Sequence, residues 1–488
     1  RKIKTLEAKR LYEESRLALL YSAAAQGGAA RPLEGAPREK AALPAHAAPE
    51  QVQPLIRALF EELLPGADFG PEDSFLEFGG DSLRMMELLC GLERDLGLEL
   101  DLRRVAATPS VAGISAYISD VLNGREADGK PDLRQECVLD EDIRPQEPYS
   151  APPEACTKVF LTGATGFLGA YLTRALLRRP GVTVYCHARA ATREQAMERI
   201  AANLRRFCCW QEDYRARIVP VPGNLDLPRL GMDSETWQRL SQEIEMVYHN
   251  GAILNFVFPY SQMKRTNVLG TAECLRFACT GRAKYFHYIS SYSVYDNPSH
   301  FDRRVLEADP LSSPDGYFLG YSETKWVAEK LVGIARQRGL QAAVYRPGDI
   351  TGTPKEGIWK LEDLISRALV GCIQLGFVPD MEANLHLTPV DYVADAIAHI
   401  SFQSAACGQA FNLINQRILP LGQITALLRR AGYPVRTVPY EEWCEKLTAC
   451  SSEENVLRIL SCLFTDQRLA GENLAERFGA RQARFDTA

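Results

Sequence analysis

The sequence predicts two fold classes in one chain: a small all-α bundle of four helices, then an α/β unit with a doubly wound parallel sheet. The bundle is predicted by apolar residues at helical spacing, as at Val52, Ile56 and Leu59. The sheet is predicted because, from Thr157 onward, short β-rich runs bounded by Gly, Pro, Asn or Ser alternate with helical stretches. Strands that are apolar almost throughout are typical of a parallel sheet covered on both faces.

The composition excludes several classes of protein. Of the 488 residues, 46% are hydrophobic and 24% are charged, so most of the chain can form packed cores. The formal net charge of −6 argues against a nucleic-acid partner, because proteins that bind nucleic acid usually carry an excess of basic residues. We find no apolar run of about 18 residues and no signal pattern, so we expect no membrane span. The 13 cysteines are scattered without metal-ligand spacing, so we expect no metal and a reduced, cytoplasmic protein.

Changes in composition divide the chain. An Ala/Gly/Pro-rich stretch and a later stretch rich in Asp, Glu, Pro and Gln read as linkers. The β/α alternation weakens after about Thr353, which predicts a smaller, mostly helical C-terminal region that binds substrate. The chain opens on Arg-Lys-Ile-Lys without Met, as expected of an excised piece of a longer polypeptide. The expected segments are a basic helix over 1–25, a linker over 26–48, the helical bundle over 49–123, a second linker over 124–155, the sheet core over 156–355 and the C-terminal region over 356–488.

A serine motif marks the helical bundle. The sequence PEDSFLEFGGDSL places a Gly-Gly turn before a helix that begins near Ser82, where the helix N-terminus favours an attached phosphate. An ordinary helix cap at Asp81 or Ser82 is the simpler alternative. FGGDSL within a short helical bundle resembles the thiolation, or carrier, domains of nonribosomal peptide and polyketide synthetases. This resemblance implies that a phosphopantetheinyl transferase attaches 4′-phosphopantetheine to Ser82, and that the thiol of this arm holds the substrate as a thioester.

A glycine motif marks the start of the sheet. The sequence KVFLTGATGFLGA joins a predicted strand, a turn with glycines at 163, 166 and 169, and a helix. The three glycines allow a tight turn, a close approach to a pyrophosphate and close packing of the helix on the sheet. The motif therefore predicts a Rossmann-type dinucleotide site rather than a βα turn that binds nothing.

Two arginines predict which dinucleotide binds. The second strand ends at Arg189 and offers no acidic residue for a ribose 2′-hydroxyl. Arg189 and Arg199 can instead hold a 2′-phosphate through charge-assisted hydrogen bonds. This predicts NADPH over NADH, whereas the alternative makes either arginine a solvated surface charge.

A Tyr-x-x-x-Lys motif supplies candidate catalytic groups. In YSETK, Tyr321 and Lys325 share one face of a helix. We expect the ammonium to lower the pKa of the phenol and to prepare it to protonate an oxyanion as hydride arrives. The upstream sequence YFHYISSYSVY offers a hydroxyl for the substrate carbonyl oxygen. Ser291 is our choice and Ser290 and Ser293 are competitors; the alternative makes them backbone-bonding turn residues.

Together these motifs resemble extended short-chain dehydrogenases/reductases, and more closely the terminal thioester reductase domains of peptide synthetases, carboxylic acid reductases and aminoadipate reductases. The resemblance covers about residues 156–440 and also rests on PVPGNLDLPRLGM, YHNGAILNFVFPY, TNVLGT, YRPGDITG and TPVDYVADAI. Asn224 departs from it, because the family commonly has Gly-Asp-Leu there. The resemblance implies catalytic Ser291, Tyr321 and Lys325, and a cofactor site of Gly163, Thr165, Gly166, Phe167, Leu168, Gly169, Arg189, Arg199, Asn224, Leu225, Asn250, Gly251, Ala252, Tyr321, Lys325, Pro347, Gly348 and Ile350.

The resemblance implies NADPH-dependent reductive release of a carrier-bound acyl, aminoacyl or peptidyl thioester as an aldehyde, with a second reduction to an alcohol open. Upstream adenylation and condensation domains would be partners. The opening RKIKTLEAKR also resembles the end of an adenylation domain, with Arg1 in place of the usual Gly, although a plain basic helix fits equally. Two other functions stay open: a redox-inactive release domain that cyclises the chain, and a non-catalytic nucleotide-binding scaffold. The first kind tends to lose the catalytic Tyr, and the second would not need a carrier.

Overall fold

The computed structural model describes most of the chain from residue 47 onward. The described residues are 47–78, 82–98, 100, 102–123, 131–256, 258–301, 303–311, 313–317, 319–450, 455–458, 464 and 484–485. The expected helix over 1–25, the linker up to residue 46 and the Gly-Gly turn before Ser82 lie outside them. Within these ranges, none of the helices combines the length and the apolarity needed to cross a bilayer.

The N-terminal described part is the predicted bundle of four helices. Its core consists of apolar residues one helical turn apart, so that Ile56, Leu59 and Phe60 of the first helix are almost fully buried. The last helix begins after Ser110, whose hydroxyl accepts a hydrogen bond of 3.0 Å from the Gly113 amide. The helices are α2 (Pro49–Leu63), α3 (Ser82–Leu96), α4 (Leu102–Ala107) and α5 (Val111–Leu122).

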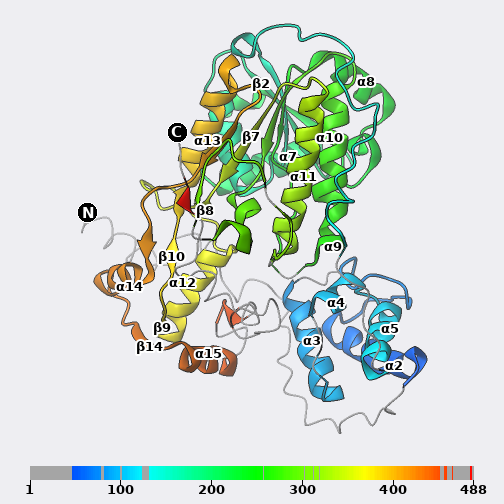
Figure 1. Ribbon diagram of the computed structural model, residues 1–488, viewed down its shortest axis with the longest axis vertical. Helices are drawn as coiled ribbons and strands as arrows, with labels where there is room; N and C mark the ends of the chain where they lie inside the picture. The colour runs from blue at the N-terminus through cyan, green and yellow to red at the C-terminus, as the bar shows by residue number, and fades with distance from the viewer. Residues whose placement is uncertain are drawn as a thin grey trace. The chain divides into compact units, whose positions relative to one another are not determined.

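The second part is built on a parallel sheet of seven strands, as predicted (Figure 1). Its strand order is β12-β7-β5-β4-β1-β2-β3, so the chain builds outward from β1 in one direction and then returns to build on its other side. Val159 of β1 pairs with Val184 of β2 and with Met246 of β4. The strands are β1 (Lys158–Thr162), β2 (Thr183–Ala188), β3 (Ile218–Pro222), β4 (Met246–His249), β5 (Tyr285–Ile289), β7 (Ala342–Pro347) and β12 (Ala410–Leu413).

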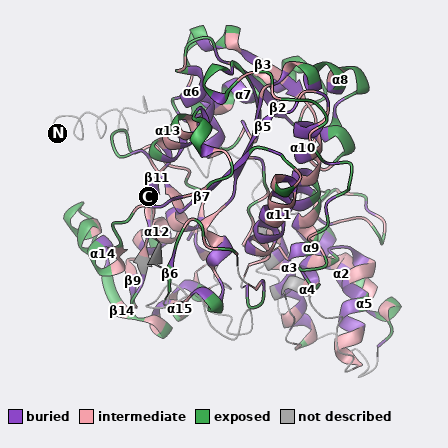
Figure 2. Ribbon diagram, turned by 45° about the horizontal axis from the view of Figure 1, so that its top comes forward, coloured by how far each residue is buried: buried purple, intermediate pink, exposed green. Residues whose placement is uncertain are grey.

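Helices cover both faces of this sheet, which explains why its strands are apolar almost throughout. Val159 and Leu161 pack with α6, α7 and α13 on one face, whereas Phe160 packs with α8, α10 and α11 on the other. Figure 2 shows the strands as buried in purple between these two layers. The helices are α6 (Phe167–Leu177), α7 (Arg193–Arg206), α8 (Ser234–Glu243), α10 (Gly270–Cys279), α11 (Gly320–Gln337) and α13 (Val390–Ser401).

The C-terminal residues contribute to the sheet as well as to a separate region. Both α13 and β12 return to the sheet, although they follow residue 355, where the sequence analysis divides the core from the C-terminal region. The remaining part combines helices with short paired strands. It contains α12 (Leu364–Leu375), β9 (Phe377–Asp380), β10 (Asn384–Leu385), β11 (Leu387–Pro389), β13 (Leu419–Pro420), α14 (Leu421–Arg430), β14 (Arg436–Pro439), α15 (Tyr440–Ala449) and β15 (Arg484–Phe485). Three short elements before residue 355 also lie outside the sheet and its helix layers: α9 (Tyr260–Lys264), β6 (Arg304–Val305) and β8 (Asp349–Thr351).

Residues 131–155, which we call the strap, differ from the free linker that their composition predicts. Leu133, Leu139 and Ile143 are buried in the core shared by α10 and α11. Sequence periodicity could not indicate this, because the apolar residues are few and follow no helical or strand spacing.

Candidate dinucleotide and catalytic site

The proposed site residues gather at one edge of the sheet, after the carboxyl ends of its strands. The glycine turn follows β1, Asn250 follows β4, Ser291 follows β5 and Gly348 follows β7. The strand order changes direction between β1 and β4, and such a switch point in an open parallel sheet forms a crevice for a ligand.

The first and the third glycine of the turn leave no space for a side chain. Gly163 has a φ of 73°, which favours glycine. Its carbonyl accepts a hydrogen bond of 3.0 Å from the Gly166 amide, which closes the turn. A Cβ on Gly169 would lie 2.0 Å from the Gly163 carbonyl oxygen, so α6 approaches the turn only because residue 169 is glycine. Thr165 lies in the turn, and Phe167 and Leu168 open the helix. A turn shaped in this way fits the pyrophosphate of a dinucleotide.

Asn203 braces this turn and was not identified from the sequence. Its side-chain amide, on α7, donates hydrogen bonds to the carbonyls of Ala164 at 3.1 Å and Gly166 at 2.9 Å. An asparagine within a helical stretch gives no sequence signal for such a contact, because its partners precede it by 39 and 37 residues.

Arg189 and Arg199 lie together at the end of β2. Arg199 donates a hydrogen bond of 2.5 Å from Nη1 to the main-chain carbonyl of Arg189. Both residues are exposed, so their guanidinium groups are open to an anion at this end of the sheet. The arrangement can accommodate a phosphate on an adenosine ribose.

The ends of β3 and β4 meet the glycine turn. Asn250 donates a hydrogen bond of 3.3 Å to the Gly163 carbonyl. Leu225 lies against Gly251, since a Cβ on Gly251 would come within 2.6 Å of the leucine side chain. Asn224 accepts a hydrogen bond of 3.1 Å from the Asp226 amide, so its oxygen shapes its own loop. Ala252 follows and is exposed.

His249 is a structural residue at the end of β4. Its Nδ1 lies 2.8 Å from the Thr162 hydroxyl, and its Nε2 lies 2.9 Å from the Thr271 hydroxyl. Burial lowers the pKa of His249 to about 3, so the ring is neutral. The Gly251 amide also donates to the Thr162 hydroxyl, at 2.9 Å. These contacts fix the backbone beside the glycine turn.

Asn267 is a second residue to which the sequence analysis gave no role. It lies in a π-helical turn over Arg265–Leu269, a local distortion that is frequent at functional sites. Its side chain exchanges hydrogen bonds with the backbone of Ile253, at 2.8 and 2.9 Å, and donates one of 3.0 Å to Thr324. It thereby joins the loop after β4 to α11, the helix with the Tyr-x-x-x-Lys motif.

Tyr321 and Lys325 share one face of α11, and Ser291 lies opposite them at the end of β5. The Ser291 hydroxyl accepts a hydrogen bond of 3.2 Å from the Ser293 amide and lies within interaction distance of the phenol of Tyr321. The Lys325 ammonium lies 5.8 Å from the centre of the Tyr321 ring and donates a hydrogen bond of 2.8 Å to the Ile289 carbonyl. The structure therefore brings together the three groups chosen from the sequence.

The expected effect of Lys325 on Tyr321 is wrong. Burial raises the pKa of Tyr321 above its ordinary value, and the interaction with Ser291 only opposes this rise. Burial also lowers the pKa of Lys325 to about 7, with the nearby Glu329 carboxylate opposing the shift. Both effects have one cause, because a low-dielectric environment disfavours a phenolate and an ammonium alike. A phenol that keeps its proton at neutral pH is the form that can donate it.

The two competing serines have different surroundings. Ser290 is buried and donates a hydrogen bond of 2.7 Å to Glu329. The Ser293 hydroxyl has no hydrogen-bond partner among the described residues. Ser291 differs from both, because its hydroxyl contacts Tyr321.

The end of β7 closes the other side of the site. Gly348 donates a hydrogen bond of 3.0 Å to the Leu413 carbonyl of β12, and Ile350 pairs with Thr388 in β8 and β11. Pro347 is the last residue of β7. Asp349, between Gly348 and Ile350, accepts a hydrogen bond of 3.0 Å from the Tyr292 hydroxyl. Burial raises the pKa of Asp349 to about 7.

Ser82 is the first residue of α3, as the motif predicts. Its side chain and the three residues before it lie outside the part of the chain that can be described.

Two protein families match this chain. The family described as "Phosphopantetheine attachment site" matches residues 54–118, and an NAD-binding family described as "Male sterility protein" matches residues 161–397. A solved structure, the terminal R domain from the myxalamid PKS-NRPS biosynthetic pathway, is 38% identical and has a TM-score of 0.67. This similarity covers 73% of our chain and 89% of that domain.

Two curated proteins are similar over most of the chain. A linear gramicidin synthase polypeptide of Brevibacillus parabrevis is 33% identical over 85% of the chain. L-2-aminoadipate reductase of Eremothecium gossypii, in its large subunit, is 32% identical over 84% of it. The chain spans 8% and 32% of the lengths of these two proteins.

Proposed function

We propose, from the premise that this chain belongs to the carrier-linked terminal reductase domains of nonribosomal peptide synthetases, that it reductively releases a thioester from its own carrier domain. The substrate is an acyl, aminoacyl or peptidyl group on a 4′-phosphopantetheine arm at Ser82. Hydride adds to the thioester carbonyl carbon, a proton goes to its oxygen, and the carbon–sulfur bond then breaks. The products are an aldehyde, the free thiol of the arm and NADP⁺.

One observation carries this proposal. Ser291, Tyr321 and Lys325 converge beside a glycine turn, at the switch point of the sheet, in a chain that also holds a phosphopantetheine attachment domain. A nucleotide-binding scaffold would need neither this group of side chains nor a carrier. A cyclising release domain would not need the proton donor that Tyr321 offers.

The residues of the chain divide the chemistry between them. NADPH, when bound, supplies the hydride. Tyr321 and Ser291 donate hydrogen bonds to the carbonyl oxygen and stabilise its developing negative charge. Tyr321 keeps its proton at neutral pH and passes it to this oxygen. Lys325 would hold the nicotinamide ribose. Asn203 and Asn267 keep the glycine turn and α11 in position.

The cofactor assignment is also a proposal. The Gly163–Gly169 turn fits the pyrophosphate because a Cβ at either end would collide with backbone atoms. We assign Asn224 and Leu225 to the adenine and residues 250–252 to the lining of the cofactor site. We assign Pro347, Gly348 and Ile350 to the border of the nicotinamide. Exposed Arg189 and Arg199 support NADPH rather than NADH.

The carrier implies partners. We propose that adenylation and condensation domains upstream load the arm and that a phosphopantetheinyl transferase installs it. The cysteines whose side chains the structure describes are free thiols, which supports a reducing compartment such as the cytoplasm.

Single-turnover release tests this function. The holo protein is loaded at Ser82 with candidate acyl groups, NADPH is added, and the product is identified by mass spectrometry while NADPH oxidation is followed by absorbance. We expect an aldehyde or its alcohol, together with NADP⁺. Tyr321→Phe should retain NADPH binding and lose about 100-fold or more in rate. Release of a cyclic product without NADPH oxidation would favour the cyclising function, and NADPH binding without release would favour the scaffold.

A further inference from the structure

The strap lies between the carrier domain and β1, and the fold separates β1 from the proposed catalytic groups. The carrier domain precedes β1 in sequence, and β1 begins at Lys158, at the amino-terminal edge of the sheet. The proposed catalytic groups lie at the opposite edge, after the carboxyl ends of β5 and β7. A carrier joined directly to β1 would be tethered at the end of the domain away from the site.

The strap begins beside the catalytic end. Arg134 forms an ion pair with Asp315, with Nη2 and Oδ2 2.7 Å apart, and also donates to the Ser313 hydroxyl at 2.6 Å. Glu136 accepts a hydrogen bond of 3.0 Å from Tyr260 of α9. Residues 313–315 lead into α11, and a Cβ on Gly320 would lie 2.6 Å from the backbone of α9. Both anchor points therefore adjoin the start of the helix that carries Tyr321.

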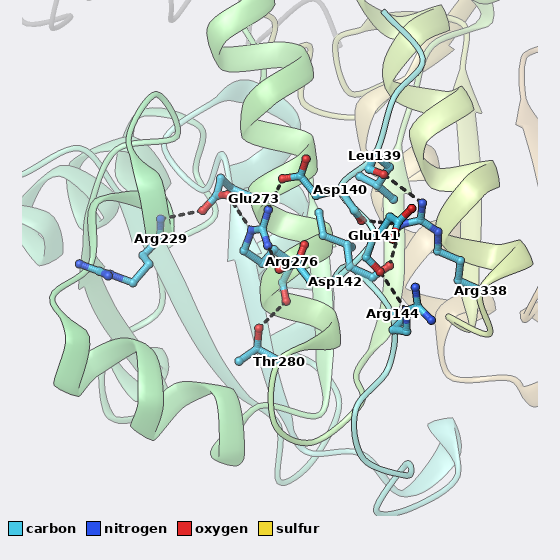
Figure 3. A network of polar contacts seen from close by, with 11 residues as sticks. Leu139, Asp140, Glu141, Asp142, Arg144, Arg229, Glu273, Arg276, Thr280 and Arg338 are labelled. Carbon is cyan, nitrogen blue, oxygen red and sulfur yellow. Dashed lines mark hydrogen bonds and ion pairs between the residues drawn. The ribbon is translucent and has the colours of Figure 1, made fainter.

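The strap then runs along α11 to its far end (Figure 1). Arg338, which follows the last residue of α11, donates hydrogen bonds to the carbonyls of Leu139 at 2.9 Å and Ile143 at 3.3 Å. Arg276 of α10 binds the carboxylates of both Asp140 and Asp142, as Figure 3 shows. Arg134 and Leu139 are five residues apart, so this part of the strap spans at most about 18 Å beside α11, which is itself about 27 Å long.

The last part of the strap reaches the amino-terminal edge. Tyr149 accepts a hydrogen bond of 2.7 Å from the Gln341 amide, directly before β7. Tyr285, the first residue of β5, donates one of 3.1 Å to the Ala151 carbonyl. The strap thus crosses the whole domain before it enters β1.

Apolar burial holds the strap more firmly than its ion pairs do. Leu133, Leu139 and Ile143 are 5%, 4% and 0% exposed. By contrast, the carboxylates of Asp140 and Asp142 are 70% and 64% exposed, so water and salt weaken their attraction to Arg276. The leucines and the isoleucine therefore anchor the strap, and the polar contacts set its position along the helices.

We propose that the strap is a fixed part of the reductase that carries the attachment point of the carrier to the catalytic end. This inference rests on the proposed function. With the strap fixed on the reductase, the tether that joins the carrier to the reductase is not the 32 residues of 124–155 but the seven residues between Asn123 and Pro131. Eight peptide links span at most about 29 Å, so the carrier stays near α9 and the start of α11. The strap therefore raises the effective concentration of the tethered thioester at its own reductase.

Tether length gives a quantitative test. Eight Gly/Ser residues are inserted between Asn123 and Pro131, and the same eight are inserted at the exposed turn at Gly181 as a control. The effective concentration falls with about the −3/2 power of tether length. Lengthening a seven-residue tether to 15 should therefore lower it about threefold, whereas lengthening a 32-residue linker to 40 should lower it only about 1.4-fold.

The measured quantity is the ratio of two rates with NADPH. One is single-turnover reduction of the thioester on the protein's own carrier, and the other is reduction of the same acyl group as free acyl-pantetheine. Octanoyl, alanyl and phenylalanyl groups serve as probes, at subsaturating concentration for the free thioester. We expect the ratio to fall about threefold in the tether insertion and to stay unchanged in the Gly181 insertion. A fall of about 1.4-fold or less would overturn the proposal.

A second measurement does not depend on catalysis. Amide hydrogen exchange in the full-length protein should show protection of the Cys137 and Ile143 amides, which donate to the carbonyls of Arg134 and Asp140, and Leu139→Asp should abolish that protection. Rapid exchange of these residues in the unaltered protein would overturn the proposal. Failure to reduce free acyl-pantetheine would instead refute the proposed function, and amide exchange would then decide whether the strap is anchored.

Discussion

Glu329 and Arg346 form an ion pair inside the reductase, with Arg346 Nε 3.0 Å from Glu329 Oε1. Their side chains are only 6% and 5% exposed. Glu329 also accepts the hydrogen bond from Ser290. Because Glu329 lies one helical turn after Lys325 and Ser290 precedes Ser291, the pair joins the elements that carry the proposed catalytic groups.

Removing one charge of this pair should destabilise the protein strongly. Glu329→Gln leaves the guanidinium of Arg346 buried without its counterion, which costs about 3–5 kcal/mol. Urea unfolding followed by tryptophan fluorescence measures the loss. Glu329→Gln combined with Arg346→Met removes both charges and should recover at least half of it. A single variant as stable as the unaltered protein would show that the pair does not support the fold.

The serine assignment can be tested with a matched pair of variants. Ser291→Ala removes the hydroxyl that contacts Tyr321 and should lower the rate of thioester reduction about 100-fold. Ser293→Ala removes a hydroxyl without a hydrogen-bond partner among the described residues and should change the rate less than twofold. Equal losses in the two variants would contradict the choice of Ser291.

The preference for NADPH should depend on Arg189. Arg189→Ala should raise the Kd of NADPH about 10- to 100-fold, because a charge-assisted hydrogen bond to the 2′-phosphate is lost. Binding of NADH, which lacks this phosphate, should stay within twofold. Arg205→Ala, on the exposed last turn of α7, is the control and should change neither value. Fluorescence titration measures both, and a parallel loss of NADH binding would argue against the phosphate contact.

Two glycines should respond in opposite directions to alanine. In Gly169→Ala the new methyl group meets the Gly163 carbonyl oxygen, which is backbone and cannot move aside, so we expect a loss of about 3 kcal/mol and of NADPH binding. Gly333 lies inside α11 with open space around it, so Gly333→Ala should stabilise the protein by about 0.5–1 kcal/mol. Urea unfolding of both variants measures these changes in the free energy of unfolding.

A buried lysine should contribute a stability term that increases with pH. Lys284 is fully buried, its ammonium donates to the carbonyls of Ser241, Thr280 and Arg282, and burial lowers its pKa to about 7. An unfolded lysine binds its proton up to about pH 10.4. Between pH 7 and 10 the unfolded chain therefore holds an extra proton at this lysine, and the contribution of Lys284 to stability increases with pH by up to about 1.4 kcal/mol per unit.

Lys284→Met provides the comparison, since it removes this titration and leaves the buried thiols and phenols in place. Unfolding free energies are measured at pH 7, 8 and 9, and the difference between the unaltered protein and the variant should shift in favour of the unaltered protein as the pH rises. Equal slopes in the two proteins would mean that Lys284 is not titrating with a lowered pKa.

The sequence by itself determined the two fold classes, the glycine turn, the position of Ser82 and the Tyr321–Lys325 pair. These features are local: each depends on residues within one helix, one strand or one turn, where spacing along the chain dictates spacing in space. The glycine turn could be predicted from the sequence because only glycine tolerates its backbone geometry and the close approach of α6.

Only the tertiary structure decided which serine meets Tyr321, that Asn203 and Asn267 brace the site, and that burial raises the pKa of the phenol. It also placed residues 131–155 on α10 and α11 and returned β12 to the edge of the sheet. Each of these depends on groups that lie far apart in sequence, such as Asp142 and Arg276, 134 residues apart. Local periodicity indicates which side of an element is buried. Which residues that side contacts, and how completely its titratable groups are removed from water, depend on the assembled fold.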